Sequence, residues 1–168
     1  GIDYRGIMGY EGHAVLIENA EERNEKAVAA LTIVGEHVDA LAEAGLPPQI
    51  VSVGGTGTHE LAANFAHVTE VQAGTYVFMD GRYQDVLPGK FASALSMLTT
   101  VVGVKDRYAV CDAGMKSLTN EFGPPRSEDG TLKVARLSEE HAFLTGDRVA
   151  NLKTGDRVTI IPSHGDRS

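Results

Sequence analysis

The stretch Ile50-Val51-Ser52-Val53-Gly54-Gly55-Thr56-Gly57-Thr58 decides the fold, and an alanine- and leucine-rich segment, His59–Phe65, follows it. A short apolar, β-branched run enters a glycine-rich turn, and the composition after the turn is that of a helix. Glycine lets the backbone take positive φ and approach a bound group closely. Thr56 or Thr58 can cap the helix, whose first N–H groups lack partners inside it. The pattern predicts a strand–turn–helix corner and favours a phosphate site there over a turn that binds nothing.

A long amphipathic helix is predicted before this corner. Between Ile17 and Ala44, apolar residues recur at spacings of three and four, and charged residues take most other positions. Gly45 and Pro47-Pro48 end the pattern. With a short strand at Tyr4–Met8, residues 3–66 are predicted to run strand, helix, strand, helix. This alternation predicts parallel strands that are joined by crossovers.

The second half of the chain has the pattern of antiparallel β structure. Beyond about Lys90, short runs rich in threonine and valine alternate with Gly-Asp and Asp-Gly turn signals. The candidate strands are Leu95–Val104, Tyr108–Cys111, Leu132–Leu137 and Arg157–Ile161, and one more strand is expected within Val68–Asp80. We therefore predict an α/β plus β protein, with an α/β unit at residues 1–89 and a mostly antiparallel β unit at residues 90–168.

Composition restricts the class of protein. The 168 residues are 42% hydrophobic and 23% charged, which is typical of a globular protein. The net charge of −8 argues against a nucleic-acid partner, and the apolar stretches are too short to cross a bilayer. A single cysteine, Cys111, rules out an internal disulfide and fits a reducing, cytoplasmic location. Because the chain begins with Gly1 and not with methionine, we expect that its N-terminus has been cut or truncated.

The segment Pro162-Ser163-His164-Gly165-Asp166 holds a candidate metal pair. In an extended segment, side chains two residues apart point the same way, so His164 and Asp166 can reach one cation. Imidazole and carboxylate together suit Mn²⁺, Zn²⁺ or Mg²⁺. A closed protein site needs three or four ligands, so the spacing alone favours a polar tail. The role of Glu139-Glu140-His141 is equally open. These residues can belong to the second coordination sphere of a metal, start a helix after Ser138, or be plain surface.

Six motifs in order resemble the D-threonine aldolase and D-serine dehydratase-like family of pyridoxal-phosphate enzymes, which have the alanine-racemase fold. They are Gly9–His13, Val51–Thr58, Thr69-Glu70 with Gly74-Thr75-Tyr76, Asp112–Lys116, Ser138–His141 and Pro162–Asp166. The resemblance covers nearly the whole chain. It implies that residues 1–89 are the C-terminal part of a pyridoxal-phosphate-binding (β/α)8 barrel. Residues 90–168 would then be the β domain that follows this barrel.

The resemblance also implies roles for individual residues. The cofactor phosphate would be held by one loop at Gly54, Gly55 and Thr56 and by a neighbouring loop at Gly74 and Thr75. Tyr10 would lie near the pyridine ring, His13 would be the base, and His164 and Asp166 would bind the metal. The dehydratase branch typically has cysteine in place of Asp166, so the aspartate favours the aldolase branch and a harder ion. The motifs assign no role to Asp112, Lys116, Glu139, Glu140 and His141.

The implied reaction is retro-aldol cleavage of a small β-hydroxy-D-amino acid to glycine and an aldehyde, with pyridoxal phosphate and Mn²⁺, Mg²⁺ or Zn²⁺ as cofactors. Two alternatives stay open: a D-serine dehydratase-like ammonia-lyase and a non-catalytic module that binds the cofactor or a phosphate.

The family's Schiff-base lysine sits on an early barrel strand, and none of the six lysines here occupies such a place. We therefore expect the C-terminal portion of a longer enzyme, and the resemblance implies that this enzyme is a homodimer. We also expect that this chain alone is inactive and that its metal pair lies on a frayed end.

Overall fold

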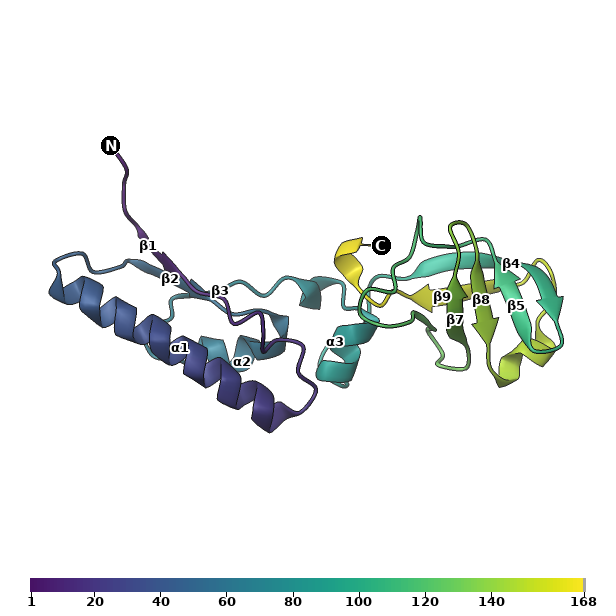
Figure 1. Cartoon of the computed structure of the whole chain (residues 1–168), viewed down its shortest axis with the longest axis horizontal. Coiled ribbons are helices and arrows are strands. Elements are labelled where there is room, and N and C mark those ends of the chain that lie inside the picture. Colours follow the sequence, from purple (N-terminus) through teal and green to yellow (C-terminus); the bar gives the residue numbers. More distant parts are fainter. Residues whose placement is uncertain (168) are drawn as a thin grey trace. The chain divides into compact units, whose positions relative to one another are not determined.

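The computed structural model describes residues 1–167, without the side chain of Arg167. The chain forms two compact units (Figure 1). The first unit comprises residues 1–76 and 85–88, and the second comprises residues 77–84 and the chain from residue 89 onward. The boundary at residues 89/90 stays a prediction, although α3 (Gly81–Val86) lies mainly in the second unit.

The first unit is an α/β layer around three parallel strands. Strands β1 (Gly6–Met8), β2 (Ile50–Val53) and β3 (Glu70–Val71) are hydrogen-bonded in that order. Helices α1 (Ala20–Glu43) and α2 (His59–Ala63) pack against the sheet. Their contact with β2 forms a core of Leu31, Val38, Val51, Val53 and Ala62. The predicted parallel strands with crossover helices are confirmed.

Local signals account for the two ends of α1. The Asn19 side chain accepts a hydrogen bond of 2.9 Å from the amide of Glu22, so the helix begins three residues after the predicted Ile17. At the other end Gly45 takes φ +78°, and its amide bonds to the carbonyl of Ala42. The amide of Leu46 bonds to the carbonyl of Leu41. This pair of bonds is a Schellman stop, as the glycine predicts.

The second unit is built on a closed antiparallel barrel of six strands, in the order β4-β5-β8-β7-β6-β9. The strands are β4 (Met97–Lys105), β5 (Tyr108–Cys111), β6 (Arg126–Ser127), β7 (Lys133–Leu137), β8 (Ala142–Thr145) and β9 (Arg157–Ile161). Leu118, Leu132, Leu144 and Ile160 are fully buried inside it. The mostly antiparallel unit is confirmed, but β6 and β8 were not predicted.

In the described chain, four short 3-10 helices lie between or after these elements. They are η1 (Thr56–Thr58), η2 (Thr75–Val77), η3 (Asp147–Asn151) and η4 (Gly165–Arg167).

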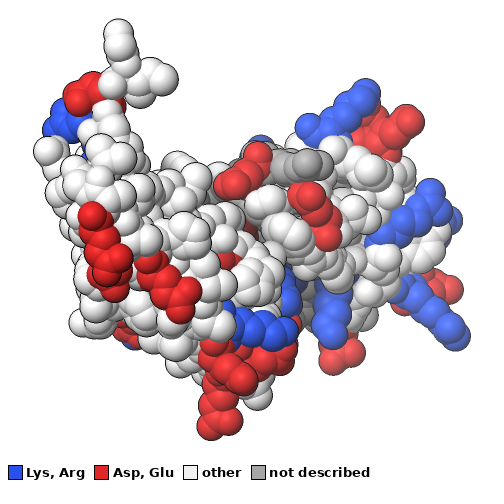
Figure 2. All heavy atoms as spheres, turned by 60° about the vertical axis from the view of Figure 1, so that its left-hand side comes forward, with Lys and Arg blue, Asp and Glu red and all other residues white. Residues whose placement is uncertain are grey.

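Among residues 1–167, no helix combines the length and apolar character that a membrane span needs. Acidic and basic side chains are scattered over the described surface in Figure 2, without a broad basic area on that face. The absence of a nucleic-acid partner stays a prediction.

Candidate functional site

The glycine loop after β2 needs glycine at two positions, for two different reasons. Gly54 has φ +85°, and a Cβ there would also lie 3.0 Å from the Cβ of Ala62. At Gly57, a Cβ would lie 1.9 Å from the backbone carbonyl oxygen of Val15. Gly55 is extended, with φ −143°. The positive φ expected from this glycine run is therefore confined to Gly54, and close packing explains Gly57.

The two predicted phosphate loops lie side by side. The Thr56 hydroxyl accepts a hydrogen bond of 3.1 Å from the amide of Tyr76, and η2 begins at Thr75 directly after the exposed Gly74. Within the described residues, the amides of Thr56 and Gly57 donate to no backbone acceptor. Backbone N–H groups at the start of a helical turn suit an anion, so this loop fits a phosphate group.

Tyr10 lies against the glycine loop. A Cβ at Gly55 would be 3.2 Å from Cε2 of the Tyr10 ring and 3.6 Å from its hydroxyl oxygen. The tyrosine is 60% exposed, so one side of the ring faces the loop and much of the rest is open. Tyr10 therefore lies next to the glycine loop, and its role beside the cofactor ring stays a prediction.

Glu11 is a loop partner that sequence reasoning missed. Its side chain is 1% exposed and accepts a hydrogen bond from the Thr58 hydroxyl. The same hydroxyl oxygen accepts from the amide of Gly55 at 3.3 Å. The buried carboxylate therefore ties the turn after β1 to the glycine loop. Only its place inside the Gly9–His13 motif could have marked it.

His13 is exposed in the turn that follows Glu11. Among the described residues, it takes part in none of the loop's hydrogen bonds given above. The geometry therefore leaves its role as the base a prediction.

The candidate metal pair lies at the end of the second unit. His164 Nε2 is 3.6 Å from Asp166 Oδ2, and the two side chains are 16% and 76% exposed. Two ligand atoms about 2.1 Å from a tetrahedral ion are about 3.4 Å apart, so the pair fits one divalent cation. No group of three histidine, cysteine or acidic side chains that could hold a metal occurs in the described chain. Metal binding by His164 and Asp166 therefore stays a prediction.

Long-range hydrogen bonds hold this terminal segment. The buried carboxylate of Asp80 accepts from the amides of Gly165 at 3.0 Å and Tyr83 at 2.8 Å. The Gly81 amide donates to the carbonyl of Pro162 at 2.8 Å. The expectation of a frayed end is wrong, because Asp80, the residue before α3, holds the backbone of Gly165 between the two candidate ligands.

The motifs at Asp112–Lys116 and Ser138–His141 form one tight joint. The amide of Met115 donates to the carbonyl of Ser138 at 2.8 Å, and Lys116 forms an ion pair with Glu140. A Cβ at Gly114 would lie 2.4 Å from the amide nitrogen of His141. The residues after Ser138 start no helix. This joint explains much of both motifs by packing.

One carboxyl group, that of Asp112, and one thiol group, that of Cys111, have shifted pKa values near the barrel. Hydrogen bonds from the Thr100 amide and the Thr99 hydroxyl, both 2.7 Å, lower the pKa of Asp112. Burial raises the pKa of the Cys111 thiol to about 11. A nucleophilic thiol is expected to have a lowered pKa, and a carboxylic acid that donates a proton at neutral pH is expected to have a raised one. Neither group has the shift that its role would need.

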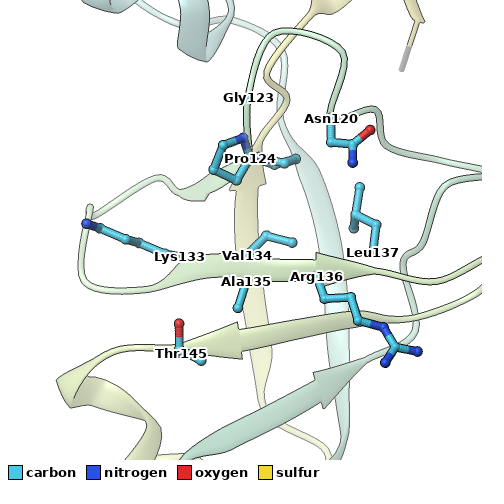
Figure 3. Close-up of a pocket in the computed structure, with 10 residues that line it drawn as sticks. Asn120, Gly123, Pro124, Lys133, Val134, Ala135, Arg136, Leu137 and Thr145 are labelled. Atoms are coloured by element: carbon cyan, nitrogen blue, oxygen red, sulfur yellow. The ribbon is translucent and has the colours of Figure 1, made fainter.

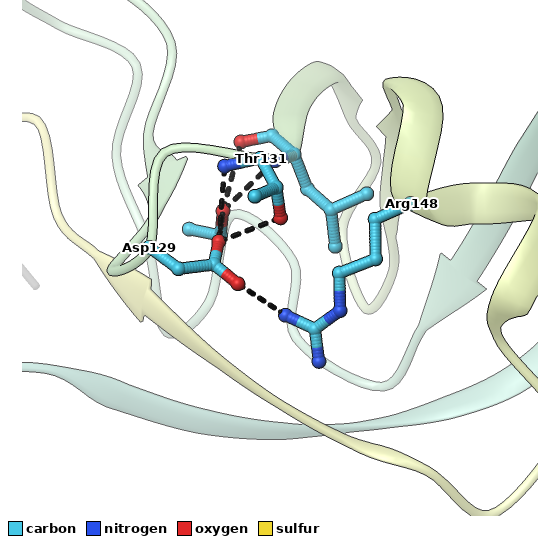
Figure 4. Close-up of polar contacts among 5 residues, drawn as sticks. Asp129, Thr131 and Arg148 are labelled. Atoms are coloured by element: carbon cyan, nitrogen blue, oxygen red, sulfur yellow. Dashed lines mark hydrogen bonds and ion pairs between the residues drawn. The ribbon is translucent and has the colours of Figure 1, made fainter.

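The turn at Asp129 is a second polar centre (Figure 4). Its carboxylate accepts hydrogen bonds from the Ser127 hydroxyl at 2.6 Å and from the Thr131 amide at 3.0 Å, and it pairs with Arg148. These donors hold the pKa of Asp129 well below its usual range. The satisfied network reads as a structural staple between β6 and η3.

A surface groove of about 440 Å³ lies on the barrel between β7 and the Gly123-Pro124-Pro125 turn (Figure 3). Val134, Leu137 and Thr145 are among the residues that line it. It contains none of the residues predicted to bind the cofactor or the metal.

Comparison with known proteins places the chain in a family. Residues 94–167 match the family model described as "Putative serine dehydratase domain". A 3-hydroxy-D-aspartate aldolase from Paracoccus denitrificans (strain Pd 1222) is 35% identical, over 98% of this chain and 45% of that protein. The D-threonine aldolase structure from Filomicrobium marinum has a TM-score of 0.92 at 30% identity and covers 98% of this chain and 46% of its own. The chain belongs to the D-threonine aldolase and D-serine dehydratase-like family.

This family contains both aldolases and dehydratases. The solved D-threo-3-hydroxyaspartate dehydratase from Delftia sp. HT23 has a TM-score of 0.85 at 27% identity, over 99% of this chain and 51% of that one. An alanine-racemase-like protein at 22% identity shares the fold, with a TM-score of 0.78. Family and fold class are thus confirmed. The chain spans about half the length of the curated relatives it matches.

Proposed function

We propose that the chain is part of a lyase that depends on pyridoxal phosphate and a divalent metal and cleaves β-hydroxy-D-amino acids to glycine and an aldehyde. The observation that carries the proposal is the pair His164 and Asp166, whose Nε2 and Oδ2 atoms are 3.6 Å apart. An oxygen ligand at residue 166 suits a hard ion such as Mn²⁺ or Mg²⁺ better than Zn²⁺. Two relatives with aldolase names support the same reaction class.

The glycine loop is proposed to hold the cofactor phosphate. The amides of Thr56 and Gly57 would donate to phosphate oxygens, with Gly54 and Gly55 allowing the close approach. The loop at Gly74-Thr75 would complete the cradle, since the Tyr76 amide already bonds to the Thr56 hydroxyl. Tyr10 would cover the ring. Pyridoxal phosphate, when bound, supplies an electron sink for the charge left on the substrate's Cα.

His164 and Asp166 are proposed to hold the metal, which supplies a Lewis acid for the substrate's β-hydroxyl. The neutral imidazole would contribute a nitrogen ligand and the aspartate an anionic oxygen. Holding the backbone of Gly165, Asp80 keeps the two ligands in place before the ion binds. A preset pair loses less conformational entropy on binding than a flexible tail would.

His13 is proposed as the base that accepts the β-hydroxyl proton, because its exposed imidazole follows directly on the loop that carries Tyr10 and Glu11. His13→Ala should lower kcat by about 10²- to 10⁴-fold while leaving cofactor binding unchanged. Steady-state kinetics with D-threonine and a cofactor titration would measure both, and His37→Ala on exposed α1 is the matched control. A normal kcat for His13→Ala would remove His13 from the mechanism.

The second candidate is a D-serine dehydratase-like ammonia-lyase, which the similarity to a D-threo-3-hydroxyaspartate dehydratase favours. Product analysis separates the two reactions. The whole protein, given D-threonine, should release equimolar glycine and acetaldehyde. Ammonia and an oxo acid, without glycine, would overturn the aldolase proposal in favour of the dehydratase.

If the whole protein catalyses neither reaction, this supports the third candidate, a non-catalytic module that binds the cofactor or a phosphate. We further propose a small-molecule substrate as the main partner, a cytoplasmic location and a homodimer. The chain of 168 residues alone is proposed to be inactive, since a Schiff-base lysine is expected outside it.

A further inference from the structure

We propose that Glu121 is a positioning residue for His164: it holds the imidazole with its proton on Nδ1, so that Nε2 becomes the metal ligand. The inference rests on the proposed metal pair and adds a residue that no sequence motif marked. Both residues belong to the second unit, so their geometry is set within one compact body.

The hydrogen bond between the two side chains dictates the tautomer. Glu121 Oε2 lies 2.9 Å from His164 Nδ1. An ionised carboxylate can only accept, so the neutral ring must carry its proton on Nδ1. The lone pair then sits on Nε2, the nitrogen that lies 3.6 Å from Asp166 Oδ2. The ring therefore presents its ligating atom on the same side as the second ligand.

Neighbouring contacts keep the ring in that orientation. The Phe122 ring lies beside the imidazole, with centroids 4.3 Å apart and an interplanar angle of 41°. The Ser163 hydroxyl donates to the carbonyl of Thr119 at 2.8 Å. The segment Thr119–Phe122 therefore contacts both Ser163 and His164, and Glu121 makes the hydrogen bond to the imidazole.

Such a carboxylate behind a metal-bound histidine has a measurable effect. It fixes ring orientation and raises ligand basicity, and its loss typically costs 10- to 100-fold in metal affinity. Glu121→Leu should weaken Mn²⁺ binding within about this range. Glu121→Gln, whose amide oxygen can still accept from Nδ1–H, should weaken it less.

The test uses the whole protein and two readouts. Free Mn²⁺ is titrated by electron paramagnetic resonance to give its dissociation constant, and ¹⁵N-histidine NMR of the metal-free protein reports the His164 tautomer. We expect the Nδ1–H form in the wild type and a shift toward Nε2–H in Glu121→Leu. Glu128→Gln is the control, because it removes one exposed carboxylate of the same unit and should change neither readout.

The outcomes separate this inference from the proposed function. If Mn²⁺ binds the wild type and His164→Ala binds it equally well, the proposed metal site is wrong. If His164 is required but Glu121→Leu keeps wild-type affinity and tautomer, the role of Glu121 is wrong. An Nε2–H tautomer in the wild type would also overturn it, whether or not the metal binds. Glu121→Gln keeps the test decisive should Glu121→Leu fail to fold.

Discussion

Gly57→Ala is expected to destabilise the protein and to weaken cofactor binding together. The new Cβ would lie 1.9 Å from the carbonyl oxygen of Val15 and 2.7 Å from its carbonyl carbon, and both are backbone atoms. Backbone cannot swing aside as a side chain can, so the loop or the turn at residues 12–16 must move. Overpacking of this kind costs about 1–3 kcal/mol. The displaced N–H groups would no longer converge on a phosphate.

Denaturant unfolding and a titration with pyridoxal phosphate would measure the two effects. Gly35→Ala is the matched control, because its Cβ would meet only the His67 ring, at 3.8 Å, inside α1. That change should stabilise the protein by about 0.5–1 kcal/mol and leave cofactor affinity unchanged. An unfolding midpoint of Gly57→Ala equal to that of the wild type would show that Val15 does not confine the loop.

His164→Ala and Asp166→Ala are expected to abolish metal-dependent cleavage. The proposed site has two protein ligands among the described residues, so removal of either would leave a single attachment point for the ion. The loss of affinity should exceed the roughly 100-fold typical of an outer-sphere change. Asp166→Cys should instead shift the preference toward Zn²⁺, since thiolate is the softer ligand.

Metal titrations of the three variants, with cofactor absorbance as a folding control, would test this expectation. The absorbance should persist in all of them, because the loop proposed to hold the cofactor contains neither His164 nor Asp166. Asp166→Ala with normal activity and normal metal dependence would return the pair to a polar surface segment.

Local chemistry explains why much of the fold could be predicted. The strand at Ile50–Val53, the turn at Gly54 and the Schellman stop at Gly45 all arise from neighbouring residues. The apolar residues of α1, at spacings of three and four, likewise form a pattern of residues close together in the sequence. Strand β8 (Ala142–Thr145) was missed because four residues between turn signals carry too little periodicity to be recognised.

The supporting residues of the site could not be predicted, because tertiary contacts create them. Glu11 meets Thr58 across 47 residues, Glu121 meets His164 across 43, and Asp80 meets Gly165 across 85. A lone glutamate or aspartate carries no sign of such a partner in the sequence. The candidate ligands themselves could be predicted only because they lie in a short motif that resembles the family's.

The measurement that tests the central claim most directly is the metal requirement of cleavage. D-Threonine cleavage by the whole protein is followed as acetaldehyde release before chelation, after removal of the metal, and after addition of Mn²⁺. The account predicts that cleavage falls to background without metal and returns with Mn²⁺, while the visible absorbance of the bound cofactor stays constant. Full cleavage by the metal-free protein would contradict it.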